Sequence, residues 1–598
     1  MTSAPKPLLI FDGRCSFCRI WVDYGKKLAA DRVDFAPSQE VADKFPEIPR
    51  EAFAQAVQLV RVDGSVTSGA RAVFETLGRE RMYEGSAVVA SASDRVYRFV
   101  AGHRTLFYWI TRLTFGTRIE PTQFELTQWL FLRVLALIYA IAFGSLAGQV
   151  LGLMGANGIS PAAGYLARLA ENFGAMRYFA FPTVFWWNTG DAVLRAGAWV
   201  GLGLAVLLFF GVAERAMLAA LYVLYLSYSF AGQEFLTFQW DSLLLEAGFL
   251  AIFFGRSDLG LRTVGWLYRW LVFRLFFLSG YVKLGSHDPT WANGTALRYH
   301  YHTQPLPTML AWYADKLPGW FQSWSVFTVL AVELGGPFLI FLPRRIRMAG
   351  AWAMLGLQAL IFMTGNYTFF GLLTAGLILF WFDDQALRWV GRLRWQRSVE
   401  TSLAAACNAA KVGLAGLTAV VMILAVGRMV ETFGRAPEPF RTLTAVTGPY
   451  QIVNSYGLFA VMTTTRPEII VEGSRDGETW EAYEFRYKPG DLKRAPGWVQ
   501  PFQPRLDWQM WFAALSDYQS NPWFLQFGLR LLQGSPEVLG LLEKNPFGGS
   551  PPRYVRATVY EYSFTDAATR ARTGEWWQRK PLGVYLPPNS LRETAEAR

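Results

Sequence analysis

The sequence is poor in charged residues and in cysteine. Charged residues make up 17% of the 598 positions, against roughly 25% in soluble domains, whereas hydrophobic residues make up 52%. This balance excludes a fully water-soluble protein and predicts that lipid surrounds much of the chain. Three cysteines are too few for an extracellular disulfide framework, which needs more pairs at wider spacings.

An uninterrupted apolar stretch is missing from the first thirty residues. Asp12, Arg14, Arg19 and Asp23 interrupt that segment, so we expect no cleavable signal peptide and an N-terminal module that stays in the cytoplasm. The net charge of +11 comes from arginines scattered between apolar runs rather than from a basic stripe. We therefore expect no nucleic-acid partner and interpret the charge as a signal of membrane topology.

The length predicts several folding units, the first of which is an α/β domain at residues 1–116. Leu8–Phe11 is typical of a buried strand, Cys15–Ala30 of a helix, Ala56–Val62 of a second strand and Gly69–Leu77 of a helix. A basic juxtamembrane segment then leads to Gln128.

A bundle of seven to nine membrane-spanning helices is predicted at residues 117–432, because a helix needs about 20 apolar residues to cross a bilayer. Ser242–Gly255 and Trp266–Leu284 carry charges and are the two uncertain spans. The spans expected are Val134–Leu153, Ala196–Ala213, Ala216–Gly232, Ser242–Gly255, Trp266–Leu284, Phe321–Leu342, a hairpin over Met348–Phe382 and Val412–Gly427.

The distribution of basic residues predicts the orientation. With an inner N-terminus, the inner loops hold Arg215, Arg344–Arg347 and Arg388–Lys411, whereas the short outer loops at Gln233–Trp240 and Gly365–Asn366 hold no Lys or Arg. We expect a multi-pass protein of a bacterial inner membrane, with a cytoplasmic N-terminus and a periplasmic C-terminal domain.

A soluble α+β domain is predicted at residues 433–598. Glu468–Gly473 and Trp480–Tyr487 flank the turn Asp476-Gly477 as in a β-hairpin, and Tyr554–Phe564 alternates like a strand. Leu506–Leu515 and Trp523–Leu532 have helical patterns. Four tryptophans of this domain bind unfolded clients, fill its core or lie at the membrane interface: Trp498, Trp508, Trp511 and Trp523.

The pair Cys15-Ser16-Phe17-Cys18 stands where a strand gives way to a helix. Cys15 at the helix N-terminus would face unpaired amides, which lowers the pKa of a thiol, and Cys18 could resolve a mixed disulfide. A vestigial pair and a zinc site including Cys407 are the alternatives, although zinc normally takes four ligands.

The stretch Ile10 to Cys18, with Asp12, Cys15 and Cys18 in a D-x-x-C-x-x-C pattern, resembles the DCC family of thiol-disulfide oxidoreductases. The resemblance implies a thioredoxin-like fold and catalytic roles for Asp12, Cys15 and Cys18. Thioredoxins place a proline just before the strand that faces the Cys pair, and no proline immediately precedes Val57.

The remainder of the chain resembles the lipase maturation factor family. The matching stretches are Trp240–Glu246, Asp288–Trp291, Tyr299–Pro307, Arg466–Glu468 and Gln503–Phe512. The resemblance implies a membrane protein that helps secreted dimeric lipases fold, with its C-terminal domain on the exported side.

Ionisable residues in or beside the predicted spans are candidate functional positions, because charge is costly in lipid. They are Asp241, Glu246, Lys283 and Glu333 within the spans, and Asp288, His300 and His302 in the loop that follows Lys283. Lys283 and its surroundings faintly resemble vitamin K-dependent carboxylases, which would make the bundle an enzyme for a lipid-soluble substrate. Alternatively, Lys283 extends to the interface and Glu246 pairs with Arg269 or Arg274.

The two histidines, at i and i+2, would share a face only on a strand, so we expect no metal and no cofactor. The main hypothesis is a membrane protein that assists folding or maturation of exported proteins and exchanges thiols at Cys15 and Cys18. Its expected partners are client proteins such as lipases, a cytoplasmic dithiol reductant and the lipid bilayer.

Overall fold

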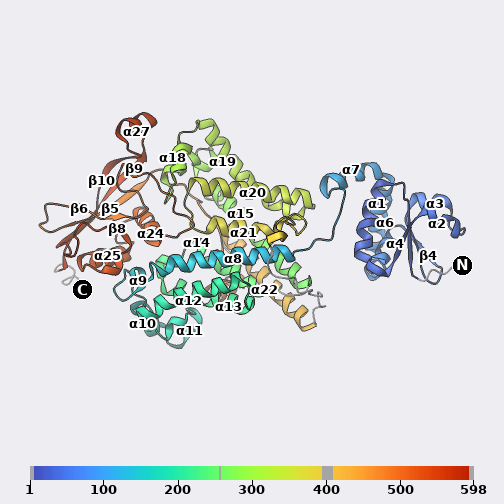
Figure 1. The fold of residues 1–598 in the computed structure, drawn as a ribbon, viewed down its shortest axis with the longest axis horizontal. Coiled ribbons are helices and arrows are strands. Elements are labelled where there is room, and N and C mark those ends of the chain that lie inside the picture. Colours follow the sequence, from blue (N-terminus) through green and yellow to red (C-terminus); the bar gives the residue numbers. More distant parts are fainter. Residues whose placement is uncertain (1–5, 255–257, 394–407, 592–598) are drawn as a thin grey trace. The chain divides into compact units, whose positions relative to one another are not determined.

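The computed structural model describes residues 6–254, 258–393 and 408–591, and the chain divides into two compact units (Figure 1). The first unit comprises Met1–Gln123 with Phe341–Ala349, and the second comprises Phe124–Ile340 with Gly350–Arg598.

The first unit is built on a four-stranded sheet. Its order is β2-β1-β3-β4, with β1 and β2 parallel and the other neighbours antiparallel. The strands are β1 (Leu8–Phe11), β2 (Asp34–Pro37), β3 (Gln58–Val60) and β4 (Val66–Ser68). This mixed sheet confirms the α/β character predicted for the N-terminal region.

Successive residues of β1 are buried on opposite faces of this sheet. Leu9 joins a cluster with Ala29 and Ala72, whereas Ile10 joins another with Phe45 and Phe53. Helices α1 (Ser16–Ala29) and α4 (Gly69–Thr76) therefore cover one face, and α2 (Ser38–Val41) and α3 (Arg50–Gln55) cover the other. The unit also contains α5 (Glu80–Glu84), α6 (Ala87–Gly102) and α7 (Arg104–Thr114).

Five helical segments in the described parts of the chain are long and apolar enough to cross a membrane. They are Glu125–Ala147, Asp191–Phe209, Gly319–Phe341, Arg344–Thr364 and Lys411–Phe433, and they include helices α8, α12, α19, α20 and α22 (Asn408–Phe433). A multi-pass membrane protein is thereby supported, but the predicted seven to nine spans are not confirmed.

Four further helices stand at the positions of the other predicted spans. The helices α14 (Gln239–Ile252) and α21 (Phe370–Ile378) are short, and α15 (Asp258–Gly285) carries buried Arg269, Arg274 and Lys283. The fourth is α13 (Glu214–Ala231). The second unit also contains α9 (Val150–Met154), α10 (Ala162–Phe173), α11 (Arg177–Ala180), α16 (Pro289–Ala292), α17 (Ala296–Thr303), α18 (Met309–Asp315) and α23 (Phe440–Thr447).

The C-terminal region contains an antiparallel sheet of order β10-β9-β5-β6. Its strands are β5 (Pro467–Ser474), β6 (Glu481–Ala482), β9 (Tyr554–Phe564) and β10 (Trp577–Asn589), and β7 (Glu484–Phe485) pairs separately with β8 (Leu542–Lys544). The helices here are α24 (Arg505–Ala514), α25 (Pro522–Leu532), α26 (Pro536–Leu539) and α27 (Ala567–Thr573). The predicted strand Tyr554–Phe564 and the hairpin between β5 and β6 are both present.

Three of the four tryptophans discussed for this region are buried where it meets the helical region. Trp508, Trp511 and Trp523 are buried, whereas Trp498 is 52% exposed. Trp511 donates its Nε1 hydrogen to the carbonyl of Thr303 in α17, at 2.8 Å. The C-terminal region thus packs directly on the helical region of the same unit.

Candidate functional site

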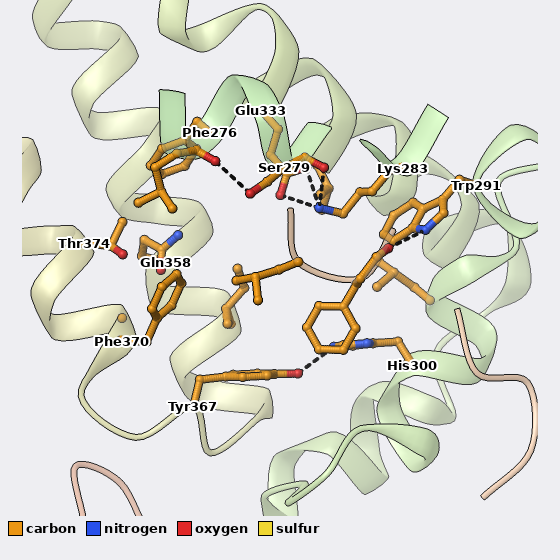
Figure 2. Close-up of a pocket in the computed structure, with 17 residues that line it drawn as sticks. Phe276, Ser279, Lys283, Trp291, His300, Glu333, Gln358, Tyr367, Phe370 and Thr374 are labelled. Carbon is orange, nitrogen blue, oxygen red and sulfur yellow. Dashed lines mark hydrogen bonds and ion pairs between the residues drawn. The ribbon is translucent and has the colours of Figure 1, made fainter. Parts of the chain in front are cut away.

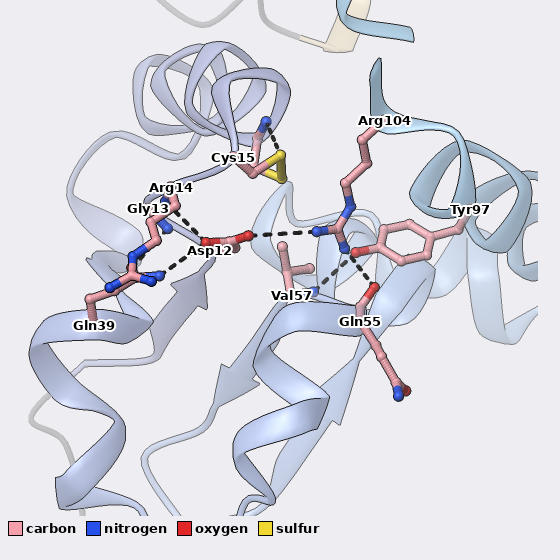
Figure 3. The surroundings of a disulfide bond; sticks show 10 residues. Asp12, Gly13, Arg14, Cys15, Gln39, Gln55, Val57, Tyr97 and Arg104 are labelled. Atoms are coloured by element: carbon pink, nitrogen blue, oxygen red, sulfur yellow. Dashed lines mark hydrogen bonds and ion pairs between the residues drawn. A yellow bond between two sulfur atoms is a disulfide. The ribbon is translucent and has the colours of Figure 1, made fainter. Parts of the chain in front are cut away.

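Cys15 and Cys18 form a disulfide at the start of α1, with their Cα atoms 5.2 Å apart (Figure 3). Cys15 is the N-cap residue of the helix, and its Sγ accepts a hydrogen bond from the Cys18 amide at 3.2 Å. A helix N-terminus stabilises a thiolate through its free amides and dipole. The geometry therefore suits thiol-disulfide exchange with Cys15 as the nucleophile.

Asp12 organises the turn that presents Cys15. Its Oδ1 accepts hydrogen bonds from the Arg14 amide and the Gln39 side chain, both at 3.0 Å. Its Oδ2 lies 3.7 Å from Nη1 of Arg104 (Figure 3). These contacts hold the Cys-bearing turn in place, and the catalytic role of Asp12 that the family pattern implies stays a prediction.

Gly13 is required in this turn by close packing. A Cβ atom at Gly13 would lie 2.7 Å from the Cβ of Pro37, closer than real Cβ atoms approach. The Gly13 amide donates to Oε1 of Gln39 at 3.0 Å. The turn and the end of β2 are therefore tightly packed.

The segment before β3 has its backbone groups satisfied by α6 and α7. The Gln55 carbonyl accepts from Nη2 of Arg104 at 2.8 Å, and the Val57 amide donates to the Tyr97 hydroxyl at 3.0 Å. Burial raises the pKa of Tyr97, so the phenol stays neutral. Side chains hold this segment where thioredoxins have a proline.

A cavity of about 570 Å³ lies beside Cys18, within the first unit. Phe17, Trp21, Phe107 and Ile110 line it together with other apolar side chains of α1, α4, α6 and α7. An apolar group can therefore reach the Cys18 end of the disulfide from this side.

The zinc alternative has no support in the described parts of the chain, where no group of three or more His, Cys, Asp or Glu side chains could hold a metal ion. Cys407, named as a further ligand, lies outside the described residues.

Of the candidate residues of the bundle, Lys283 and His300 line one cavity, whereas Asp241, Glu246, Asp288 and His302 do not line it. Asp241 of α14 forms a buried salt bridge with Arg505 of α24, with Oδ1 to Nη2 at 3.0 Å. The Tyr225 hydroxyl donates to the same carboxylate at 2.5 Å, and Nη1 of Arg505 donates to the Phe235 carbonyl at 2.6 Å. Asp241 thereby joins the helical region to the C-terminal region.

Glu246 makes a second buried connection of this kind. It pairs with Arg274 of α15, which agrees with one of the two predicted partners. Its Oε2 also accepts from the Tyr456 hydroxyl at 2.7 Å and from the Asn454 amide at 2.8 Å. Both carboxylate oxygens of Glu246 thus have partners within the protein, which gives this residue a structural role.

Lys283 is buried and ion-paired rather than extended to an interface. Its Nζ donates to both oxygens of Glu333, at 2.9 and 2.7 Å, and to the Ser279 carbonyl at 3.2 Å (Figure 2).

Asp288 is the N-cap residue of α16, where its side chain accepts a hydrogen bond from the Thr290 amide, and it also accepts one from the Met462 amide at 2.6 Å. Burial alone would raise the pKa of Asp288, but these hydrogen bonds outweigh it and lower the pKa. Glu246 and Asp288 do not line the cavity that Lys283 lines.

His300 and His302 lie on helix α17 and have different partners. His302 Nδ1 lies 3.1 Å from Oδ1 of Asp315, whereas His300 Nε2 lies 3.2 Å from the Tyr367 hydroxyl. Residues at i and i+2 share a face only on a strand, and these two histidines lie on a helix. Their separate partners therefore agree with the expectation.

Arg466 belongs to one of the stretches that resemble the family and is not among the candidate site residues, yet it is a central residue of the contact between the helical and C-terminal regions. It donates to the carbonyls of His302 and Pro305, both at 2.8 Å, and to that of Gln304. It also pairs with Glu468 at 2.7 Å. Asn366 similarly bonds Gly497 and Val499 across this contact, at 2.9 and 2.8 Å. The clustering of the family stretches is the signal that could have identified Arg466.

The fold and the disulfide define a class: a multi-pass membrane protein with an N-terminal thiol-disulfide exchange domain. Three family models match it: "DCC1-like thiol-disulfide oxidoreductase" at residues 9–109, "Lipase maturation factor transmembrane domain" at 126–389 and "Lipase maturation factor C-terminal domain" at 452–587. The chain belongs to the lipase maturation factor family and carries a DCC-like domain at its N-terminus.

Curated relatives agree over most of the chain. Lipase maturation factor 2 of Gallus gallus is 36% identical over 581 residues, covering 77% of this chain and 81% of that protein. Lipase maturation factor 1 of Bos taurus is 35% identical and covers 80% and 91%, and lipase maturation factor 2 of Homo sapiens is 35% identical and covers 78% and 83%. No solved structure was found to match.

Proposed function

We propose that this protein assists the folding or maturation of exported proteins and that secreted lipases are its client class. The observation that carries the proposal is identity of about 35% to lipase maturation factors 1 and 2 across more than three quarters of the chain. The family stretches around Asp241, Arg466 and Arg505 include the buried contacts that join the C-terminal region to the bundle. Nothing in the site geometry favours the alternative of a membrane-embedded enzyme.

Thiol exchange at the N-terminal disulfide is the second part of the proposal. In the reduced domain, the Cys15 thiolate attacks a partner disulfide, forms a mixed disulfide and releases one partner thiolate. The Cys18 thiolate then attacks Sγ of Cys15, which forms the Cys15–Cys18 disulfide and releases the second partner thiolate. Two electrons pass to the partner, and a dithiol reductant returns them to this domain.

The proposed orientation puts the N-terminal unit in the cytoplasm and the C-terminal region on the exported side. The predicted number of spans, nine or seven, is odd in either case, which would put the two ends of the chain on opposite sides, and the inner loops predicted with that topology are rich in arginine. The sequence holds three cysteines, so a second pair that could relay electrons across the membrane is not present in it. Thiol exchange therefore acts on partners on the same side as the disulfide. Placement in a bacterial inner membrane stays a prediction, since the relatives named above are from animals.

A photocrosslinking experiment tests client contact and orientation together. A photoreactive amino acid replaces Trp498, which is 52% exposed in the C-terminal region, or Val88, which is 79% exposed in the N-terminal unit. We expect a co-expressed exported lipase to crosslink at position 498 and not at position 88. Crosslinking at position 88 alone would contradict the orientation, and no crosslinking at either position or at neighbouring exposed residues would contradict client binding.

A further inference from the structure

A cavity of about 110 Å³ lies within the second unit among α15, α19 (Gly319–Leu334), α20 (Arg344–Thr364) and α21 (Figure 2). Helix α17 and the segment at Phe459 complete its wall. An apolar cavity of about 150 Å³ accepts benzene, so this one is large enough for the end of a small chain or part of a ring.

The charges at the cavity cancel. The ammonium of Lys283 has three N–H donors, and they are used by the two oxygens of Glu333 and by the Ser279 carbonyl. Because the ion pair is complete, neither residue offers a net charge to an occupant. The cavity favours an uncharged ligand.

His300 lines the cavity and has one buried ring nitrogen without a hydrogen-bond partner among the described residues. Nε2 of Gln304 donates to the carbonyls of Tyr301 and Thr364, which fixes the Gln304 amide, and the Tyr367 hydroxyl donates to its Oε1 at 2.9 Å. With the Tyr367 hydrogen given to Gln304, the Tyr367 oxygen accepts from Nε2–H of His300, and Nδ1 of this tautomer carries no proton. That buried Nδ1 has no hydrogen-bond partner among the described residues.

A second polar group is unpartnered on the opposite wall. Thr374 of α21 is fully buried, lines the cavity, and its Oγ1 has no partner in the described parts of the chain (Figure 2). A buried polar atom without a hydrogen bond is costly, so two such atoms at one cavity indicate a missing partner.

The remaining wall is apolar and adjoins an exposed apolar side of α20. Phe276, Ile361 and Phe370 line the cavity, and Leu360 of α20, the residue next to Ile361, is 62% exposed as expected for a lipid-facing side chain. We propose that this cavity binds the polar end of an uncharged, hydroxyl-bearing lipid taken from the bilayer, whose hydroxyl satisfies His300 or Thr374. This site is separate from the disulfide and does not depend on the proposed client function.

The test uses the full-length protein in phosphatidylcholine nanodiscs, without detergent. The probe is hexadecanol carrying a diazirine and an alkyne, and hexadecanoate with the same groups is the charged comparison. We expect the alcohol to label peptides that contain Phe276 or Ile361, unlabelled hexadecanol to compete, and the carboxylate to label them far less.

Matched variants separate specific binding from adsorption. Thr374→Val keeps the volume and removes the hydroxyl, and we expect binding to weaken about two- to tenfold, the worth of one neutral hydrogen bond. Gly371 lines the cavity, and a Cβ atom at this position would meet no atom closer than 3.8 Å, so Gly371→Leu can place its side chain there without a clash at Cβ. The leucine should fill the cavity and abolish labelling. The controls are Thr418→Val, away from the cavity, and Gly356→Leu, where a Cβ meets nothing within 4 Å.

Equal labelling of all variants would mean that the lipid is adventitious only, and it would overturn the proposal. Stronger labelling by the carboxylate than by the alcohol, or no labelling by the alcohol, would also overturn it. If Thr374→Val fails to fold, the comparison of Gly371→Leu with Gly356→Leu decides the outcome.

Discussion

Arg505 and Asp241 are 264 positions apart in the sequence, yet their side chains form a salt bridge at 3.0 Å with 0% and 1% of their surfaces exposed. The pair joins two of the stretches by which the chain resembles its family. It therefore gives these stretches a common physical role, the attachment of the C-terminal region to the helical bundle.

Breaking this pair should destabilise the second unit strongly. We expect Asp241→Leu to lower the free energy of unfolding by about 3–5 kcal/mol, because Arg505 is left as an uncompensated buried charge. Thermal unfolding of the purified protein measures the effect. In the double variant Asp241→Leu with Arg505→Leu, part of the loss should be recovered, and a double variant as unstable as the sum of both singles would contradict this account.

Two glycines of the first unit should respond to alanine with opposite signs. Gly13→Ala forces its Cβ against Pro37 and should cost about 1–3 kcal/mol through overpacking. Gly25→Ala lies within α1, where the nearest side-chain atom is 3.8 Å away, and should stabilise by up to about 1 kcal/mol through helix propensity. Limited proteolysis of the N-terminal unit in the full chain measures both, and equal effects would argue against the packing described for the turn.

Acid should destabilise the second unit through His300. Burial and the nearby charge of Lys283 lower the pKa of His300 from its ordinary value of 6.5 to about 4. In the unfolded chain this histidine takes up a proton below about pH 6.5, whereas in the folded chain it stays neutral down to about pH 4. The neutral, buried His300 therefore contributes fully to the free energy of unfolding above pH 6.5. This contribution, up to about 3 kcal/mol, is lost as the pH falls toward 4.

Thermal unfolding between pH 7.5 and 4.5 measures this loss. His300→Gln should flatten the pH dependence, and the matched control His287→Gln, at an exposed position, should leave it unchanged. An identical slope in wild type and His300→Gln would show that other groups cause the acid sensitivity.

Cysteine variants should distinguish the nucleophile from the resolving thiol. With Cys18→Ser, the mixed disulfide at Cys15 cannot be resolved, and we expect partner adducts on non-reducing gels that disappear with reductant. Cys15→Ser should give few or none. Adducts that form equally with both variants would contradict the assignment of Cys15, and their absence with both would indicate an inert pair.

Local elements with strong patterns were predictable from the sequence. Leu8–Phe11 and Tyr554–Phe564 are strands with the predicted bounds, because each is a short apolar or alternating run followed by turn or polar residues. Helices α6 and α7 were not predicted, since their mixture of arginine and aromatic side chains reads as a basic juxtamembrane segment. Their roles depend on contacts with Asp12 and Val57, far away in the sequence.

The candidate residues of the bundle were predictable as buried charges, but their partners were not. Lys283 and Glu333 are 50 positions apart, so no local spacing indicates that they pair. The choice of Arg274 over Arg269 for Glu246 also depends on helix packing, because the two arginines are only five positions apart on α15.

The ratio of active to total exported lipase tests the central claim most directly. It would be measured in cells that lack any related factor and contain the wild-type chain, the Arg505→Leu variant at matched abundance, or neither. We predict a higher active fraction in cells with the wild-type chain. In cells with Arg505→Leu, the active fraction should fall toward the value measured in cells that contain neither form. An active fraction that is the same in all three cells, with the wild-type protein folded in the membrane, would contradict a maturation function.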